Sequence, residues 1–132
     1  MSDKTPAIHG YHVHVYYDAG TQPVAAKLRA ELTARFPVRA GELQDAPQGP
    51  HPISQFQVIF KADVFQDVVP WMMLHRQGLD VLVHPLTDDM VDDHTDYALW
   101  IGTPVALRID TLYQPPLTHS SWVNGGWYEW HP

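Results

Sequence analysis

The sequence predicts an α+β protein with a ferredoxin-like βαββαβ fold, in which both helices cover one face of an antiparallel sheet. Two observations support this fold: short segments with alternating apolar residues, and two intervening segments with apolar residues at helical spacing. The 132 residues are expected to form a single domain, 1–132. Within it we expect a ferredoxin-like core at 8–110 and an aromatic-rich C-terminal extension at 111–132.

The first strand is predicted over residues 10–18, where histidines alternate with apolar residues. Thr21 is placed to cap the following helix, with Pro23 in its first turn. Pro37 ends that helix, and a short strand is predicted at 38–44. The apolar stripe of the helix recurs at every fourth position: Val24, Leu28 and Leu32.

The second half of the core follows a loop rich in Pro and Gly at 46–52. Strands are predicted at 55–61 and 79–84, with a helix between them. Asp63 is expected to cap this helix, with Gln66 completing a capping-box pair, and Pro70 to kink it or shift its start. Its apolar face, including a methionine pair assigned to the core, comprises Phe65, Val68, Val69, Met72 and Met73.

Side chains alternate between the two faces of a strand, and this alternation tests the predicted fold. The helix-covered face receives only apolar or aromatic residues: Tyr11, Val13, Val15, Tyr17, Phe56, Val58, Phe60, Leu79, Val81 and Val83. The other face, which the helices leave open, receives His12, His14, Tyr16, Gln57, Leu82 and His84. Because the first and last strands are neighbours in this topology, we expect His84 to approach His12 and His14.

The composition narrows the partners and the cofactors. A net charge of −7 argues against nucleic acid and anionic membrane surfaces. With no cysteine, any metal must use histidine, carboxylate or water ligands. The first residues lack a basic and then apolar signal sequence, and no apolar run approaches the roughly 20 residues that span a bilayer. A cytoplasmic protein is the resulting expectation.

Three histidines indicate a mononuclear metal site. His12 and His14 must share one face of the first strand, and His84 ends the last strand of the core. Imidazoles held on one face by rigid backbone suit a divalent metal better than a hydrophobic core. The alternative interpretation is that these are solvated histidines on an open sheet face.

Other residues near the predicted site have two possible interpretations each. His51 is either a functional residue or an ordinary loop residue, and His94 either acts in chemistry or neutralises neighbouring carboxylates. Those carboxylates are metal ligands, groups that orient an imidazole, or a solvated turn: Asp88, Asp89, Asp92 and Asp93. Residues 96–102 form either a short helix or a closing strand. The remaining histidines, His9, His75, His119 and His131, are interpreted as surface residues.

The tail is rich in aromatic residues: Trp122, Trp127, Tyr128 and Trp130. We expect them to pack on the domain or on a partner subunit, because a sheet with one bare face needs a cover. A lid over the substrate is the alternative interpretation of the tryptophans.

Several short motifs occur in an order that resembles the DOPA 4,5-dioxygenase family over residues 10–110. They are YHVHVYYD at 11–18, GPHP at 49–52, QFQV at 55–58, VLVHP at 81–85, DHT at 93–95 and ALWIG at 98–102. The chain departs from the family after His84-Pro85, where Leu86-Thr87-Asp88-Asp89 replaces the usual Asn-Thr-Gly-Asp. The departure bears on the shape of this turn and on the substrate, and the tail beyond Pro116 lies outside the resemblance.

The resemblance implies a homodimer with non-haem Fe(II) that performs extradiol cleavage of a catechol, such as DOPA, with O₂. Zinc or another divalent metal is compatible with a histidine-rich site. Extradiol chemistry needs three protein ligands on one side of the metal. His14 and His84 are the expected ligands, with His12 or His51 as the third. His94, with His51 as the other candidate, is the expected acid–base residue.

Two alternatives remain open at this point. One is a metal- or small-ligand-binding ferredoxin-like module without turnover. The other is a metal-dependent hydrolase or isomerase on the same scaffold, because a fold does not determine a function.

Overall fold

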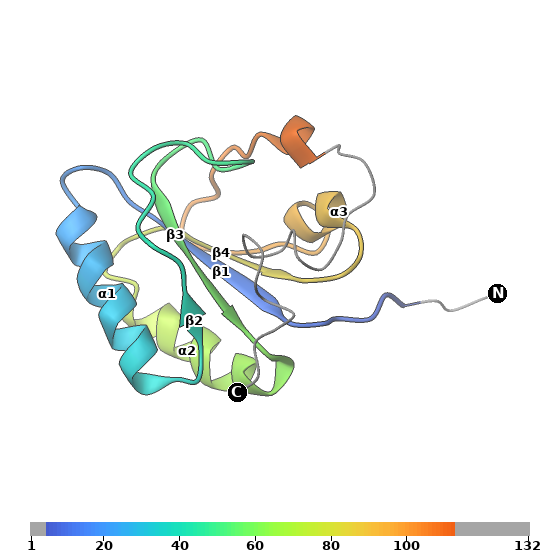
Figure 1. The fold of residues 1–132 in the computed structure, drawn as a ribbon, viewed down its shortest axis with the longest axis horizontal. Coiled ribbons are helices and arrows are strands. Elements are labelled where there is room, and N and C mark those ends of the chain that lie inside the picture. The colour runs from blue at the N-terminus through green and yellow to red at the C-terminus, as the bar shows by residue number, and fades with distance from the viewer. Residues whose placement is uncertain (1–4, 113–132) are drawn as a thin grey trace.

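A five-stranded antiparallel sheet with the strand order β2-β3-β1-β4-β5 organises the chain (Figure 1). The structure is a computed structural model, and it describes residues 5–112. The strands are β1 (Tyr11–Tyr16), β2 (Arg39–Ala40), β3 (Gln55–Phe60), β4 (Val81–Pro85) and β5 (Leu99–Ile101). The helices are α1 (Gln22–Arg35), α2 (Phe65–His75) and α3 (Met90–His94), with 3₁₀ turns η1 (Ala62–Val64) and η2 (Ile109–Leu112).

This architecture confirms the predicted α+β fold. β1 pairs with both β3 and β4, so the first and last strands of the core are neighbours as expected. β5 adds a fifth strand beside β4, so residues 96–102 contain the closing strand and not the helix. The described residues form one sheet with its covering helices, whereas residues 113–132 lie outside the description. The division into a core at 8–110 and an extension at 111–132 stays a prediction.

Helices α1 and α2 lie on one face of the sheet and enclose the hydrophobic core (Figure 1). The predicted alternation is confirmed, because the inward residues of β1, β3 and β4 pack in a single cluster against the helices. Burial of this apolar surface is the main stabilising contribution expected for such a layered fold. The buried helix residues are Ala25, Leu28 and Leu32 of α1, and Val68, Val69 and Met72 of α2.

The predicted helix caps are not made. Thr21 precedes α1, but its hydroxyl contacts Asp18 and does not cap the helix. Asp63 lies inside η1, and this 3₁₀ turn delays the start of α2 to Phe65. The helix then continues through Pro70, whose side chain is exposed.

The assignment of the methionine pair to the core is wrong for one of its members. Met72 is fully buried, whereas Met73 is 53% exposed. At about 100° per residue, Met73 lies beyond Val69 at the edge of the buried stripe, where its side chain meets solvent. The short strand predicted at 38–44 is reduced to two residues, and the carboxylate-rich turn contains the helix α3.

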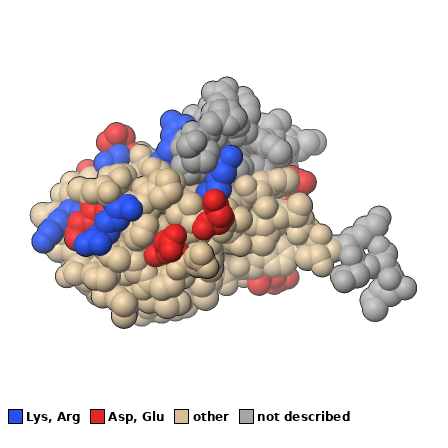
Figure 2. All heavy atoms as spheres, turned by 90° about the horizontal axis from the view of Figure 1, so that it is seen from below, with Lys and Arg blue, Asp and Glu red and all other residues tan. Residues whose placement is uncertain are grey.

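The charged side chains of the described residues do not form one large basic patch on the face shown in Figure 2. Basic and acidic side chains lie next to each other in small mixed groups, and broad uncharged areas separate these groups from one another. Among the described residues, no helix has the length and apolar character needed to cross a membrane.

A buried histidine cluster as the candidate metal centre

The sheet face opposite α1 and α2 carries the predicted histidines. His12 and His14 project from β1 and His84 from β4, and the register places His12 directly opposite His84. Their exposed fractions are only 4%, 2% and 1%. The interpretation as solvated histidines on an open face is therefore wrong, because this face is covered.

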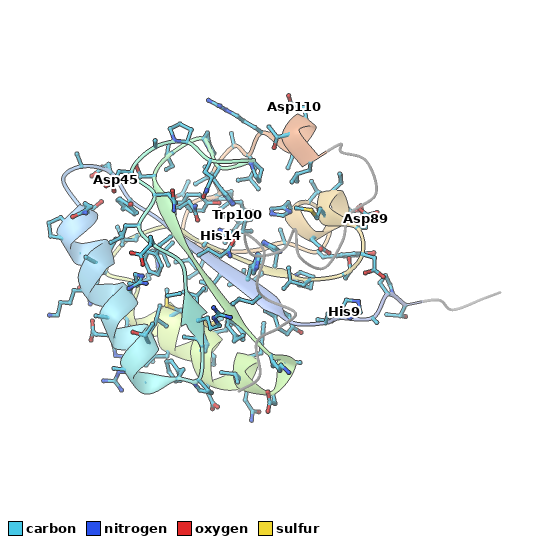
Figure 3. The ribbon with its side chains drawn as sticks, in the orientation of Figure 1. His9, His14, Asp45, Asp89, Trp100 and Asp110 are labelled. Atoms are coloured by element: carbon cyan, nitrogen blue, oxygen red, sulfur yellow. The ribbon has the colours of Figure 1, made fainter. Side chains whose placement is uncertain are left out.

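The cover is formed by the loop before β3, by α3 and by η2, which lie on the far side of the sheet from α1 and α2 (Figures 1 and 3). They enclose a cavity of about 230 Å³. His51 enters it from the loop and His94 from α3, so five histidines line one cavity. The ring centroids of His14 and His51 are 4.1 Å apart, as are those of His84 and His94.

Three of these histidines have their tautomers selected by carbonyl acceptors. The Nδ1–H of His14 donates to Gln55 Oε1 at 2.8 Å, and the Nδ1–H of His84 donates to the Pro85 carbonyl at 2.8 Å. His94 donates its Nδ1–H to the Met90 carbonyl at 2.7 Å. A neutral imidazole with a proton on Nδ1 presents a lone pair on Nε2. All three rings therefore present Nε2 as a potential metal ligand.

The Nε2 atoms of His14 and His84 lie 3.1 Å apart. With both protons on Nδ1, two lone pairs face each other and no hydrogen bond joins the rings. Burial and the neighbouring imidazoles hold the pKa of both side chains well below the ordinary 6.5. Neither ring therefore gains a proton at neutral pH that would turn this contact into a hydrogen bond.

The third strand-borne ring, His12, is also short of a partner. Its Nε2 is buried and has no hydrogen-bond partner among the described residues. Burial and the positive charge that His94 or His51 would carry lower its pKa well below 6.5 as well. Neutral nitrogen donors converging from one surface fit a divalent cation.

Two sets of histidines have nitrogen atoms close enough to share one metal ion. The first is His12, His14 and His84, and the second is His14, His51 and His94. His14 belongs to both sets. Neither set contains a carboxylate, and these are the sets found within residues 5–112.

His51 differs from the other rings because its Nδ1 contacts a phenol. The distance from Tyr16 Oη to His51 Nδ1 is 2.7 Å. A phenol hydroxyl can donate this hydrogen bond, and His51 then carries its proton on Nε2. Tyr16 itself is buried and stacks on Trp100, and burial raises its pKa above the ordinary 10.

The acidic residues next to the cavity have structural partners. Asp93 accepts hydrogen bonds from the Thr87 N–H and hydroxyl, and Asp89 caps α3 by accepting from the Asp92 N–H. Burial raises the pKa of Asp93 to about 6. These contacts favour a role in shaping the turn over a role as metal ligands. His94 is likewise bonded to a carbonyl and not to an aspartate.

Two contributors to the site were missed by the sequence reasoning: Gln55, and Thr87 as the partner of the candidate carboxylate Asp93. The alternation of Gln55 with Phe56 places Gln55 on the histidine face and is the signal that could have found it. His9 and His75 are half-buried and lie away from the cluster, His9 beside Asp88 and His75 stacked on Trp71. His119, His131 and the tail aromatics lie outside the described residues.

Two comparisons with known proteins name the same family. The model of the Dopa 4,5-dioxygenase family matches residues 11–111. A DOPA 4,5-dioxygenase from Amanita muscaria is 30% identical over 111 residues, which cover 77% of this chain and 49% of the relative. An uncharacterized 21.2 kDa protein from Botryotinia fuckeliana is 34% identical over 115 residues, covering 77% of this chain and 62% of that protein.

The chain thus spans about half to three-fifths of the length of these curated relatives. A crystal structure from Nostoc punctiforme, described as a candidate dioxygenase, superposes with a TM-score of 0.78 and 52% sequence identity. The match covers 80% of this chain and 91% of that one. With a family match across most of the chain and the histidine cluster inside it, the chain belongs to the Dopa 4,5-dioxygenase family.

Proposed function

We propose that this protein is an iron-dependent extradiol dioxygenase that cleaves the ring of a catechol such as DOPA. The observation that supports it most directly is the pair of buried Nε2 atoms 3.1 Å apart, on two rings whose Nδ1 atoms each contact a carbonyl oxygen. A resident Fe(II) would turn this unfavourable contact into two metal–nitrogen bonds. Family membership points to the same class of chemistry.

The ligand set that we propose is His12, His14 and His84. All three come from adjacent strands of one sheet, whose hydrogen bonds hold them in a preset arrangement. The unpartnered Nε2 of His12 supports its inclusion. The competing set is His14, His51 and His94. If His51 and His94 bound the metal, neither could act as an acid or a base towards the substrate.

When bound, Fe(II) would supply open coordination positions that bring catechol and O₂ together. The remaining work falls to side chains of the cavity. His94 has Nε2 free to accept a catechol proton, and its Nδ1–H bond to the Met90 carbonyl stabilises the resulting imidazolium. His51, with Tyr16 donating to Nδ1, holds a proton on Nε2 and is the proposed acid.

The cavity also limits what can react there. Its five imidazoles lie beneath α3, η2 and the loop before β3, which shield the proposed metal from bulk water. The described lining residues include no Lys or Arg. We propose that the ring of the substrate enters this cavity and that any charged substituent remains towards solvent. A homodimer in the cytoplasm, with one domain over 1–132, remains part of the proposal.

A metal-binding module without turnover is the second candidate. The observation in its favour is the number of imidazoles, because five nitrogen donors could close the coordination sphere of zinc. A closed sphere would leave no position for substrate. The two candidates therefore differ in whether the bound metal keeps open positions.

The deciding experiment is oxygen uptake. Protein reconstituted anaerobically with Fe(II) is mixed with DOPA, caffeate or protocatechuate in air-saturated buffer, and metal content is measured on the same sample. We expect rapid uptake with a yellow product, absent in the His14→Ala/His84→Ala double variant and retained in His75→Ala. Bound iron without uptake on any of the three would contradict the enzyme and favour the binding module.

A further inference from the structure

We propose that Gln55 is a positioning residue that selects the metal-binding tautomer of His14; this inference rests on the proposed metal site. Gln55 begins β3, is 2% exposed, and lies opposite Tyr16 in the β1–β3 register. Its Oε1 accepts the Nδ1–H of His14 at 2.8 Å. No other hydrogen bond to His14 Nδ1 is found within the described residues.

The side chain of Gln55 is held at both ends. Its Nε2 donates to Gln48 Oε1 at 3.3 Å, which turns the amide oxygen towards His14. Its backbone N–H and carbonyl both pair with Gln44, at 3.1 and 2.9 Å. The loop that carries His51 is thus linked through Gln48 and Gln55 to His14. A shift of this loop would therefore move the acceptor that sets the tautomer of His14.

The alternative tautomer shows why the acceptor matters. Without an acceptor at Nδ1, His14 can move its proton to Nε2 and donate it to His84 Nε2, which is already at the hydrogen-bonding distance of 3.1 Å. That bond would occupy both nitrogens that are proposed to bind the metal. Gln55 therefore favours metal binding by making the competing His14–His84 hydrogen bond unavailable.

Two substitutions separate this role from simple packing. Gln55→Leu keeps a side chain of similar bulk but removes the acceptor. Gln55→Glu keeps the acceptor for His14 and loses the N–H donated to Gln48, whose own amide can turn to donate to the new carboxylate. Gln66→Leu makes the same chemical change on the exposed surface of α2, on the other side of the sheet, and serves as the matched control. Circular dichroism and thermal unfolding establish that each variant is folded.

The first measurement is Co(II) affinity, from the visible spectrum and from competition with a chelator. We expect Gln55→Leu to weaken binding about 10- to 100-fold, as is typical when a partner of a ligating histidine is lost. Gln55→Glu should bind at least as tightly as the unmodified protein, because a carboxylate accepts from Nδ1–H more strongly. Gln66→Leu should leave the affinity unchanged. Equal affinity in Gln55→Leu, or an equal loss in both Gln55 variants, would overturn the proposal.

The second measurement is independent of metal. Long-range ¹H–¹⁵N spectra of metal-free protein report which nitrogen of His14 carries the proton. We expect Nδ1–H in the unmodified protein and in Gln55→Glu, and a shift towards Nε2–H in Gln55→Leu. An Nε2–H tautomer in the unmodified protein would overturn the role of Gln55. Failure of the unmodified protein to bind any metal would instead contradict the proposed function and leave this test intact.

Discussion

The imidazoles of His14 and His84 face each other through their Nε2 atoms at 3.1 Å while both donate their Nδ1 protons elsewhere. They come from neighbouring strands, but His14 is registered against Leu82 and not against His84. The approach is therefore diagonal across the sheet, which brings the ring ends together while the backbones stay in regular pairing. A site prepared in this way loses little further freedom when it binds a cation.

Removing either imidazole of this pair should abolish metal loading. In His14→Ala or His84→Ala, two of the three proposed ligands remain, and two protein donors do not suffice for a stable site. We expect metal bound per chain to fall to near zero after desalting, measured by elemental analysis.

His75→Ala is the matched control for this prediction. His75 lies on α2, on the opposite side of the sheet, and its Nδ1 bonds to the Trp71 carbonyl. Its metal content should equal that of the unmodified protein. Full loading of a folded His84→Ala variant would exclude the proposed ligand set and favour His14, His51 and His94.

The stability of metal-free protein should fall as the pH drops below about 6.5. The pKa values of all five cavity histidines are lowered, chiefly by burial, so the unfolded chain gains protons that the folded chain excludes. Well below pH 6.5, each histidine that stays neutral in the folded state removes up to about 1.4 kcal/mol of unfolding free energy per pH unit. Stability should be nearly constant above that range, where these rings are neutral in both states.

Asp93 works in the opposite direction over a narrower window. Its pKa is raised from 3.8 to about 6, so the folded state holds a proton that the unfolded state releases between these values. It should offset part of the loss below pH 6 without reversing it. Urea unfolding at a series of pH values, after removal of metal by a chelator, measures the balance. An unchanged unfolding free energy between about pH 7 and pH 5 would contradict the buried neutral cluster.

Tyr16→Phe should slow turnover while leaving metal binding intact. The substitution removes only the hydroxyl that contacts His51 Nδ1, so the proton of His51 is no longer directed to Nε2. We expect kcat to fall about 10- to 100-fold, near the lower end of the range for acid–base catalysis. The oxygen electrode measures the rate and elemental analysis the metal content.

Tyr97→Phe removes a hydroxyl from a side chain that is 40% exposed and is the corresponding control. It should not change kcat. A Tyr16→Phe variant with unchanged turnover would remove His51 from the proposed acid role and leave His94 as the only proton-transfer candidate in the proposal.

Asp93→Ala should destabilise the turn that carries His94. The substitution leaves the buried N–H of Thr87 without its acceptor and leaves the Thr87 hydroxyl with the Asp89 carbonyl at 3.5 Å. The expected loss is about 1–3 kcal/mol of unfolding free energy, the usual cost of unsatisfied buried groups. Urea unfolding measures it. Asp96→Ala, an exposed site just beyond α3, should change stability little, and an equal effect of the two substitutions would contradict the role of Asp93.

Local periodicity was enough to predict the fold because each face of each strand is chemically uniform. A register error of one residue in β1 would have exchanged Val13 and Val15 for His12 and His14 in the core. The alternation therefore determined which histidines share a surface, and the strand order brought His84 to them. The alternation of residues did not predict where the helices begin. The start of α2 depends on the 3₁₀ turn η1, and the Thr21 hydroxyl contacts Asp18 instead of capping α1, and neither feature has a distinctive sequence pattern.

What the sequence by itself determined is the ferredoxin-like core and the membership of His12, His14 and His84 in one face of the sheet. Only the tertiary structure decided that this face is buried and that His51 and His94 approach it from separate covering segments. It also decided that Gln55 and Tyr16 contact the Nδ1 atoms of His14 and His51. The physical reason is the range of the interactions. Periodic burial is encoded by neighbours along a strand, whereas a tautomer is selected by one hydrogen bond between residues as far apart as 41 positions, as for His14 and Gln55.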